Sequence, residues 1–348
     1  MAQQVSTADC APPPGLSVEA ELGTGTFGTV YRAVLEDGRA VAAKRFVRGD
    51  ADVCGAEKSG KREAKMLRQL QSHRLICGLV SQTTTDNALW LTTELGGPSL
   101  ASLTWLKVEG EYTRVCGQSS RTYRVDRGHF WHDLFEDEKD VTKPVAHKKL
   151  RVLLARLLEA VEHLSSNGIV HADIKPDNIL VDVDTATPRL CDFGSAYEFA
   201  VGDPGGSATP EYRAPECVTH PQTLRTAPPA SVDVYAVGAV FLELACGFPV
   251  WFPFNSRVCD PPGRPTYRCK PGRWLRGALA VPNREGRKVA KRQGEVVRDL
   301  CSVLRHMPGK GLSRDTDAVD LLERLLDVDP ATRASPAAAR ALPFLAGH

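Results

Sequence analysis

Four polar side chains near the middle of the chain could carry out phosphoryl transfer. Residues 171–178 read His-Ala-Asp-Ile-Lys-Pro-Asp-Asn, and Asp192 opens an Asp-Phe-Gly sequence further along. Moving a phosphoryl group requires a carboxylate that accepts a hydroxyl proton, ligands for a metal ion, and cations near the phosphates. Asp173 could accept the proton, while Asn178 and Asp192 could bind the metal. Lys175 could neutralise the transferring group, although either motif alone would also fit a solvated acidic turn before a strand.

A glycine-rich segment near the N-terminus could bind phosphates. Residues 22–30 contain Gly-x-Gly-x-x-Gly, which dinucleotide-binding proteins also carry at the start of a helix. Here β-branched and aromatic residues follow instead, and Asp37-Gly38 supplies a tight turn, so we predict a hairpin. Glycines let backbone amides approach phosphate oxygens. Lys44, in the next apolar run, could then reach the phosphates; the alternative is a solvated surface lysine.

Apolar periodicity places these motifs on regular elements. Residues 57–70 put apolar side chains three apart on one face, which predicts a helix that also carries Glu63. The runs 78–85 and 88–95 flank an Asp-Asn pair and predict another hairpin. Leucines recurring at helical spacing over 150–164 predict a longer helix, which would deliver the His-Ala-Asp motif.

In this order, the motifs resemble those of eukaryotic protein kinases of the serine/threonine type. Further matches are Ala-Pro-Glu at 214–216, a helix start at 231–238, and Arg333. Tyr-Arg-Ala-Pro-Glu and Cys-Asp-Phe-Gly-Ser are similar to the CMGC group, which contains cyclin-dependent, mitogen-activated and Clk-like kinases. The resemblance implies an α+β, bilobal protein kinase fold, with a five-stranded antiparallel N-lobe carrying one main helix and a mostly helical C-lobe.

The resemblance also divides the chain. We expect a flexible leader at 1–15, the N-lobe at 16–95, and the hinge with the C-lobe at 96–346. Two stretches exceed the usual family length, and we read them as insertions at 107–146 and at about 252–311. The first is predicted to be a loop.

The family's functional residues can be placed on this chain by motif. The catalytic residues implied are Asp173 as base, Lys175, Lys44, Glu63 and Thr209, with Glu63 preferred over Glu57 as the partner of Lys44 because Glu57 lies near the helix start. The nucleotide-binding residues implied are Leu22, Gly23, Gly25, Gly28, Val30, Ala42, Lys44, Thr93, Glu94, Leu95 and Leu180. The metal ligands implied are Asn178 and Asp192. ATP and Mg²⁺ are the expected cofactors, with Mn²⁺ as an alternative metal.

Two structural pairings also follow from the resemblance. Asp233 should accept hydrogen bonds from catalytic-loop amides, and Arg333 should pair with Glu216. A buried charge without a partner is costly, so the last two residues are expected together.

Charge is distributed unevenly along the chain. Residues 256–310 contain 14 Lys and Arg against 4 Asp and Glu, a net charge of +10, so the rest carries −8 of the chain's total of +2. Such a segment suits an acidic protein substrate or a regulatory partner, and a merely solvated face is an equally good interpretation. Aromatic residues are sparse in it, so nucleic acid is not favoured.

The composition restricts where in the cell the protein is expected. The ten cysteines form no Cys-x-x-Cys pair and stand in no zinc-binding spacing with histidine, which favours reduced thiols. The N-terminus has neither the basic nor the apolar region of a signal peptide, and the most apolar run, 232–246, contains two acidic residues. We therefore expect an intracellular protein, in the cytoplasm or nucleus, without a membrane partner.

The implied function is that of an active ATP-dependent serine/threonine protein kinase; the alternative is a pseudokinase or scaffold that acts through its insertions. Ala172 stands where most regulated kinases have the arginine that meets an activation-segment phosphate. We therefore expect activity without such phosphorylation, although Ser207 could still be phosphorylated and meet Arg213. Cys191, next to Asp192, is expected at the back of the nucleotide site, either reactive through nearby cations or inert through burial.

Overall fold

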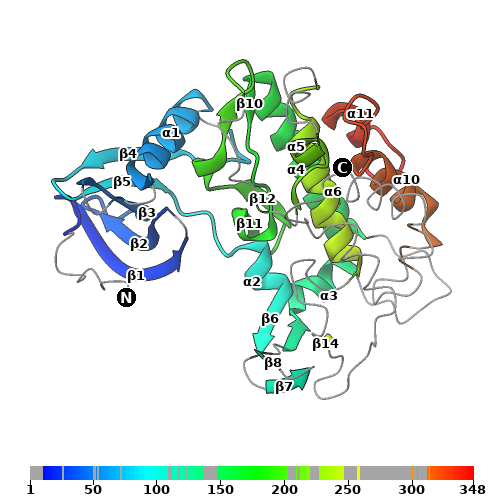
Figure 1. Cartoon of the computed structure of the whole chain (residues 1–348), viewed down its shortest axis with the longest axis horizontal. Helices are drawn as coiled ribbons and strands as arrows, with labels where there is room; N and C mark the ends of the chain where they lie inside the picture. Colours follow the sequence, from blue (N-terminus) through cyan, green and yellow to red (C-terminus); the bar gives the residue numbers. More distant parts are fainter. Residues whose placement is uncertain are drawn as a thin grey trace.

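The computed structural model describes residues 11–25, 27–49, 52, 55–70, 73–108, 112–115, 118–121, 124–135, 147–202, 209, 212–219, 227–246, 257–258, 300, 304, 312 and 314–348. The chain forms two lobes: a small one built on a sheet and a larger one that is mainly helical (Figure 1). This is the α+β, bilobal arrangement that the motifs implied.

The small lobe is a five-stranded antiparallel sheet with the strand order β1-β2-β3-β5-β4. Its strands are β1 (Leu16–Thr24), β2 (Thr29–Leu35), β3 (Ala40–Val47), β4 (Leu79–Thr84) and β5 (Ala88–Glu94). Both predicted hairpins are present. Gly38, with φ of 82°, makes the turn between β2 and β3, a conformation that glycine adopts without strain.

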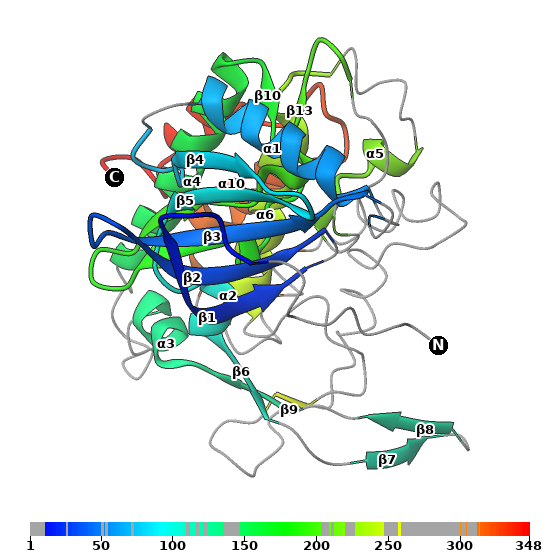
Figure 2. The same ribbon diagram turned by 90° about the vertical axis from the view of Figure 1, so that its left-hand side faces the viewer.

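Helix α1 (Ala56–Gln69) crosses the sheet, where the apolar periodicity predicted a helix (Figure 2). Gly60 faces β3 and β5 so closely that a Cβ there would lie 2.8 Å from both Phe46 and Leu89. The helix therefore packs directly on the sheet, and its next turn brings the buried Glu63 toward Lys44 of β3.

The large lobe is organised around α6 (Ser231–Cys246), which is buried along its whole length. An apolar helix without a polar face is typical of the centre of a core. Helix α4 (Lys148–Ser166) packs against it and ends at Gly168, whose φ of 67° is that of a helix C-terminal glycine. Further helices among the described residues of this lobe are α5 (Glu216–Thr219), α10 (Thr316–Leu325) and α11 (Pro336–Arg340).

Two short pairs of antiparallel strands lie next to the His-Ala-Asp and Asp-Phe-Gly motifs. Strands β11 (Ile179–Asp182) and β12 (Thr187–Leu190) pair and place the Asn-containing loop beside the Asp-Phe-Gly segment. Strand β10 (Ile169–Val170) pairs with β13 (Tyr197–Glu198).

The first insertion contains regular structure, so the prediction of a loop over 107–146 is wrong for its described part. After α2 (Leu100–Thr104) come β6 (Trp105–Val108), β7 (Tyr112–Val115), β8 (Gln118–Arg121), β9 (Arg124–Arg127) and α3 (His129–Phe135). Strand β6 pairs with β9, and β7 with β8, forming an arm that extends from the large lobe (Figures 1 and 2). These four-residue strands of mixed polarity lack the alternation that would reveal them in the sequence.

The basic segment 256–310 falls mostly outside the described residues. Its described strand, β14 (Arg257–Val258), pairs in parallel with β9 of the arm. Among the described residues, no helix is both long and apolar enough to cross a membrane.

Both predicted pairings of buried charges are confirmed. Asp233 accepts hydrogen bonds from the backbone amides of His171 (2.8 Å) and Ala172 (2.9 Å). Arg333 binds both oxygens of Glu216, at 2.6 and 2.9 Å, and both side chains are almost fully buried. The ion pair thus ties Glu216, the last residue of the activation segment (residues 192–216), to the C-terminal part of the lobe.

Replacing Arg333 by alanine should lower the free energy of unfolding by about 3–5 kcal/mol, because Glu216 would stay buried without its partner. Urea denaturation measures the change. Arg324→Ala is the matched control: Arg324 pairs with Asp320 on an exposed helix face, and its loss should cost less than about 1 kcal/mol. Equal effects of the two changes would contradict the buried-pair account.

Candidate functional site

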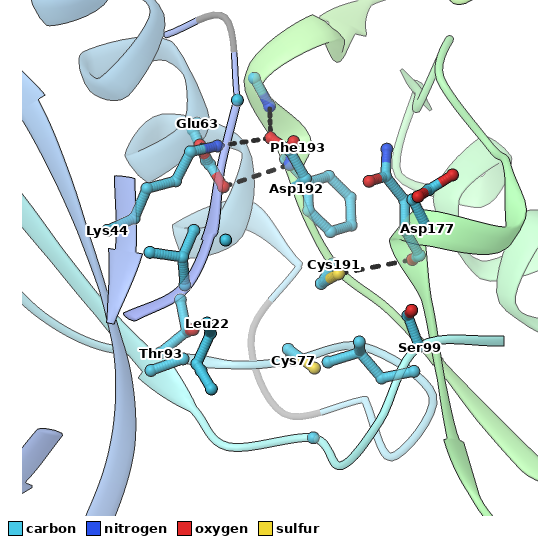
Figure 3. A pocket seen from close by; sticks show the side chains of 18 of the residues that line it. Leu22, Lys44, Glu63, Cys77, Thr93, Ser99, Asp177, Cys191, Asp192 and Phe193 are labelled. Carbon is cyan, nitrogen blue, oxygen red and sulfur yellow. Dashed lines mark hydrogen bonds and ion pairs between the residues drawn. The ribbon is translucent and has the colours of Figure 1, made fainter. Parts of the chain in front are cut away.

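A cavity of about 620 Å³ lies between the lobes. Figure 3 shows Lys44 and Glu63 entering it from the small lobe, opposite Asp192 and Phe193 of the large lobe. Every residue that the sequence placed in the nucleotide, catalytic or metal set lines this cavity. The sequence did not single out Cys77 and Ser99, which also line it, because neither belongs to a recognisable motif.

The glycine-rich loop between β1 and β2 packs closely against the backbone of β3. A Cβ at Gly28 would lie 2.3 Å from the carbonyl oxygen of Arg45, so strand β3 leaves no room for a side chain there. Gly23 has open space instead, and the amide of Gly25 donates to the carbonyl of Gly28 at 2.9 Å. The loop is therefore folded as a tight flap over the cavity.

Lys44 lies between two carboxylates, one from each lobe. Its Nζ is 2.9 Å from Glu63 Oε2 and 2.5 Å from Asp192 Oδ1. Burial alone would lower the pKa of Lys44, but the two carboxylates outweigh burial and raise it above its usual range. The lysine therefore stays charged at every physiological pH.

The two carboxylates differ in their electrostatic setting. Burial raises the pKa of Glu63. The attraction of Lys44 lowers this pKa, and the nearby negative charge of Asp192 raises it, so that the pKa stays above its usual range. Burial also disfavours the Asp192 carboxylate, but Lys44 and the amide of Gly194 outweigh it and hold the pKa of Asp192 low. Asp192 is accordingly the better anion for a cation in the cavity.

Helix α1 holds the Asp-Phe-Gly segment by three further contacts. Glu63 Oε1 accepts from the amide of Phe193 at 3.3 Å. The carbonyl of Gly194 accepts from Ser59 Oγ at 3.3 Å and from the guanidinium of Arg62. The helix and the segment are thus joined through both backbone and side chains.

The catalytic loop gathers its polar groups around Asp173. Its Oδ1 accepts from the amide (2.8 Å) and the hydroxyl (2.7 Å) of Thr209, and its Oδ2 accepts from Lys175 Nζ at 2.9 Å. Lys175 also donates to the Thr209 hydroxyl at 2.8 Å. Ala172, just before Asp173, has φ of 63°, a strained conformation for alanine, which the two amide bonds to Asp233 hold in place.

A family model for the protein kinase domain matches residues 16–114 and 124–345, nearly the whole chain. This chain belongs to the protein kinase family. A probable cyclin-dependent kinase 10 from Dictyostelium discoideum is 28% identical over 334 residues, which cover 93% of this chain and 76% of that protein. The mitogen-activated protein kinase mpkC of Aspergillus fumigatus is 25% identical over 337 residues, covering 94% of this chain and 74% of that one. Both names belong to the CMGC group that the motifs indicated.

Protein kinases use ATP with a divalent cation, and this cavity offers suitable cation ligands. The side-chain amide nitrogen of Asn178 donates a hydrogen bond to the backbone carbonyl oxygen of Asp173 at 2.9 Å. The amide oxygen of Asn178 therefore lies on the other side of the side-chain amide. The amide of Cys191 donates to the carbonyl of Asn178 at 3.1 Å, which keeps Asp192 beside Asn178. Within the described part of the chain no three His, Cys, Asp or Glu side chains cluster around a potential metal site. A cation here would therefore rely on these two oxygen ligands together with nucleotide phosphates, as Mg²⁺ commonly does.

Two thiols line the kinase cavity, and the surroundings of both disfavour the thiolate form. Burial raises the pKa of Cys191 well above its ordinary value and that of Cys77 to about 11. Lys44 does act on Cys191 in the opposite direction, but its influence is smaller than that of burial. Of the two alternatives that the sequence left open, the structure favours the inert thiol.

Cys191 should therefore be alkylated by iodoacetamide at pH 7.5 at least about tenfold more slowly in the folded kinase than in the same protein unfolded in urea, because only the thiolate reacts. Mass spectrometry of the peptide that contains Cys191 gives both rates. Equal rates would show that the thiol is either exposed or ionised in the folded protein.

Proposed function

We propose that this protein is an active serine/threonine protein kinase that transfers the γ-phosphoryl group of ATP to protein hydroxyls. One observation carries the proposal: the bonded group of Asp173, Lys175 and Thr209 shares a cavity with the Lys44–Glu63–Asp192 cluster. The proton acceptor and the phosphate-binding groups are thereby assembled in one place.

Each residue has a distinct task in this proposal. Asp173 accepts the proton of the attacking hydroxyl, and Lys175 offsets the negative charge of the transferring group. Lys44, oriented by Glu63, binds the α- and β-phosphates under the glycine flap. Asp192 and Asn178 would hold Mg²⁺, with Mn²⁺ as an alternative, and a cation bound there would supply positive charge beside the phosphates. The nucleotide base would lie against Leu22, Val30, Ala42, Thr93, Glu94, Leu95 and Leu180.

Serine/threonine specificity is supported by one bond and by the relatives. A lysine two residues after the catalytic aspartate is typical of serine/threonine kinases, and residues 208–213 resemble their substrate-binding segment. Here Lys175 donates both to Asp173 and to Thr209 of that segment. The cyclin-dependent and mitogen-activated relatives agree with this assignment. A scaffold that only used the fold to hold partners would have no need to retain the whole set of catalytic groups.

We further propose that activity does not depend on a phosphate in the activation segment. Glu198 of that segment accepts from Lys65 at 2.7 Å and from Gln69 at 3.0 Å, both on α1. A fixed carboxylate thus makes a contact between the segment and the helix that a phosphate could otherwise supply. Ser207, the nearby hydroxyl that could be phosphorylated, lies outside the described residues.

The domain limits, the partners and the cellular location of this kinase are also proposals. The proposed domain limits are a leader at 1–15, the N-lobe at 16–95 and the hinge with the C-lobe at 96–346. An acidic protein substrate or a regulatory partner would bind the basic insertion, which lies mostly outside the described residues. Cytoplasm or nucleus remains the expected location.

Asp173→Asn should reduce phosphoryl transfer to a protein or peptide acceptor by at least about a hundredfold, because general base catalysis commonly contributes that much. Its affinity for MgATP should stay within about threefold of the parent's. Transfer from radiolabelled ATP to a peptide array measures the first quantity, and titration calorimetry measures the second.

Asp184→Asn is the matched control, since Asp184 lies on an exposed turn between β11 and β12. This variant should transfer at the parent rate. A parent that binds MgATP and transfers no phosphate would favour the scaffold; an Asp173→Asn protein as fast as the parent would refute the assignment of the base.

A further inference from the structure

Two tryptophans, near the two ends of the stretch from β6 to α3 (residues 105–135), fix this stretch to the same end of α6. Trp105 begins β6, and its indole Nε1 donates to Glu243 Oε1 at 2.7 Å. Trp131 lies in α3 at the other end, and its Nε1 donates to the carbonyl of Leu244 at 2.9 Å. Both indoles are almost completely buried. The arm is therefore mounted on the large lobe at two adjacent points.

Glu243 has a second bond that leads toward the catalytic centre. Its Oε2 accepts from the hydroxyl of Tyr212 at 2.5 Å, and the carboxylate is fully buried. A buried carboxylate is costly unless hydrogen bonds compensate it, so each donor matters for where the carboxylate lies. Trp105 and Tyr212 are thus held by opposite oxygens of one group, although they are 107 residues apart in the sequence.

Tyr212 belongs to the segment that also contains Thr209. The amide of Tyr212 donates to the carbonyl of Thr209 at 3.2 Å, and Thr209 binds Asp173 by two hydrogen bonds. A continuous series of bonds therefore runs from the root of the insertion through Glu243 and this segment to the catalytic carboxylate.

We infer that Trp105 is a positioning residue for the protein substrate: its indole N–H fixes Glu243, which holds Tyr212 and, with it, the segment beside Asp173. The inference rests on the proposed kinase activity and adds a role for the insertion. Changes at the arm reach the substrate side of the cavity through this carboxylate. The glycine flap and Lys44, which face the nucleotide from the small lobe, are not members of this series.

The two tryptophans provide a matched pair of variants. Trp105→Phe and Trp131→Phe each keep a buried aromatic ring and each remove one indole donor from the end of α6. Only the first removes a donor from Glu243, because the second bond ends on a backbone carbonyl. A general loss of packing should affect both variants alike, and thermal unfolding measures that loss separately.

Trp105→Phe should lower kcat/KM for a peptide substrate by about tenfold, which corresponds to about 1.4 kcal/mol, with the KM for ATP unchanged. Trp131→Phe should leave both values within about twofold of the parent's. Because Trp105 and Tyr212 act through one carboxylate, Trp105→Phe and Tyr212→Phe together should lower kcat/KM by less than the product of their separate effects.

Three outcomes would overturn the inference: equal peptide kinetics in Trp105→Phe and Trp131→Phe, a change in the KM for ATP as large as that for peptide, or fully multiplicative effects in the double variant. If the parent itself transfers no phosphate, the proposed function fails and the inference fails with it. That result differs from an active parent with indistinguishable tryptophan variants, which would refute the inference alone.

Discussion

The arrangement of this kinase depends on one buried cation shared by carboxylates from both lobes. Lys44 comes from the central strands of the small lobe, Glu63 from its helix, and Asp192 from the large lobe. A buried charge is tolerated only with partners, so each of these groups restricts where the other two can lie. The relative placement of the lobes and the geometry of the nucleotide site are thereby coupled.

Close packing of α1 on the sheet brings these charged side chains together. Gly60 lets α1 approach β3 and β5, and without that close approach Glu63 could not reach Lys44. The same helix binds the backbone of Phe193 and Gly194, and it meets Glu198 further along the activation segment. Three separate groups of contacts thus fix the helix against Lys44, the Asp-Phe-Gly segment and Glu198.

Local sequence patterns predicted the elements well and distant contacts less well. Asp37-Gly38 indicated a hairpin because the turn chemistry is local, and the leucine spacing of α4 indicated a helix for the same reason. The strands of the arm were missed since each has four residues and little alternation. The bond between Trp105 and Glu243 joins residues 138 apart, and no periodicity signals such a contact.

In the candidate site, too, local motifs were predictable and properties that depend on distant contacts were not. Lys44, Asp173 and Asp192 lie in motifs whose spacing identified them, and the structure brings them to one cavity. The state of the Cys191 thiol could not be predicted, because it depends on how burial compares with the attraction of Lys44. Sequence gives the neighbours of a residue along the chain, while the dielectric environment comes only from packing.

We propose that these contacts assemble the active site without phosphorylation of the activation segment. The most direct test is the time course of peptide phosphorylation by protein that has been treated with a phosphatase and verified by mass spectrometry to carry no phosphate. The account predicts a linear course from the first measurable point, at the rate of untreated enzyme. A lag that shortens as enzyme concentration rises, or a rate lower by about tenfold or more, would show that phosphorylation is needed to complete the site.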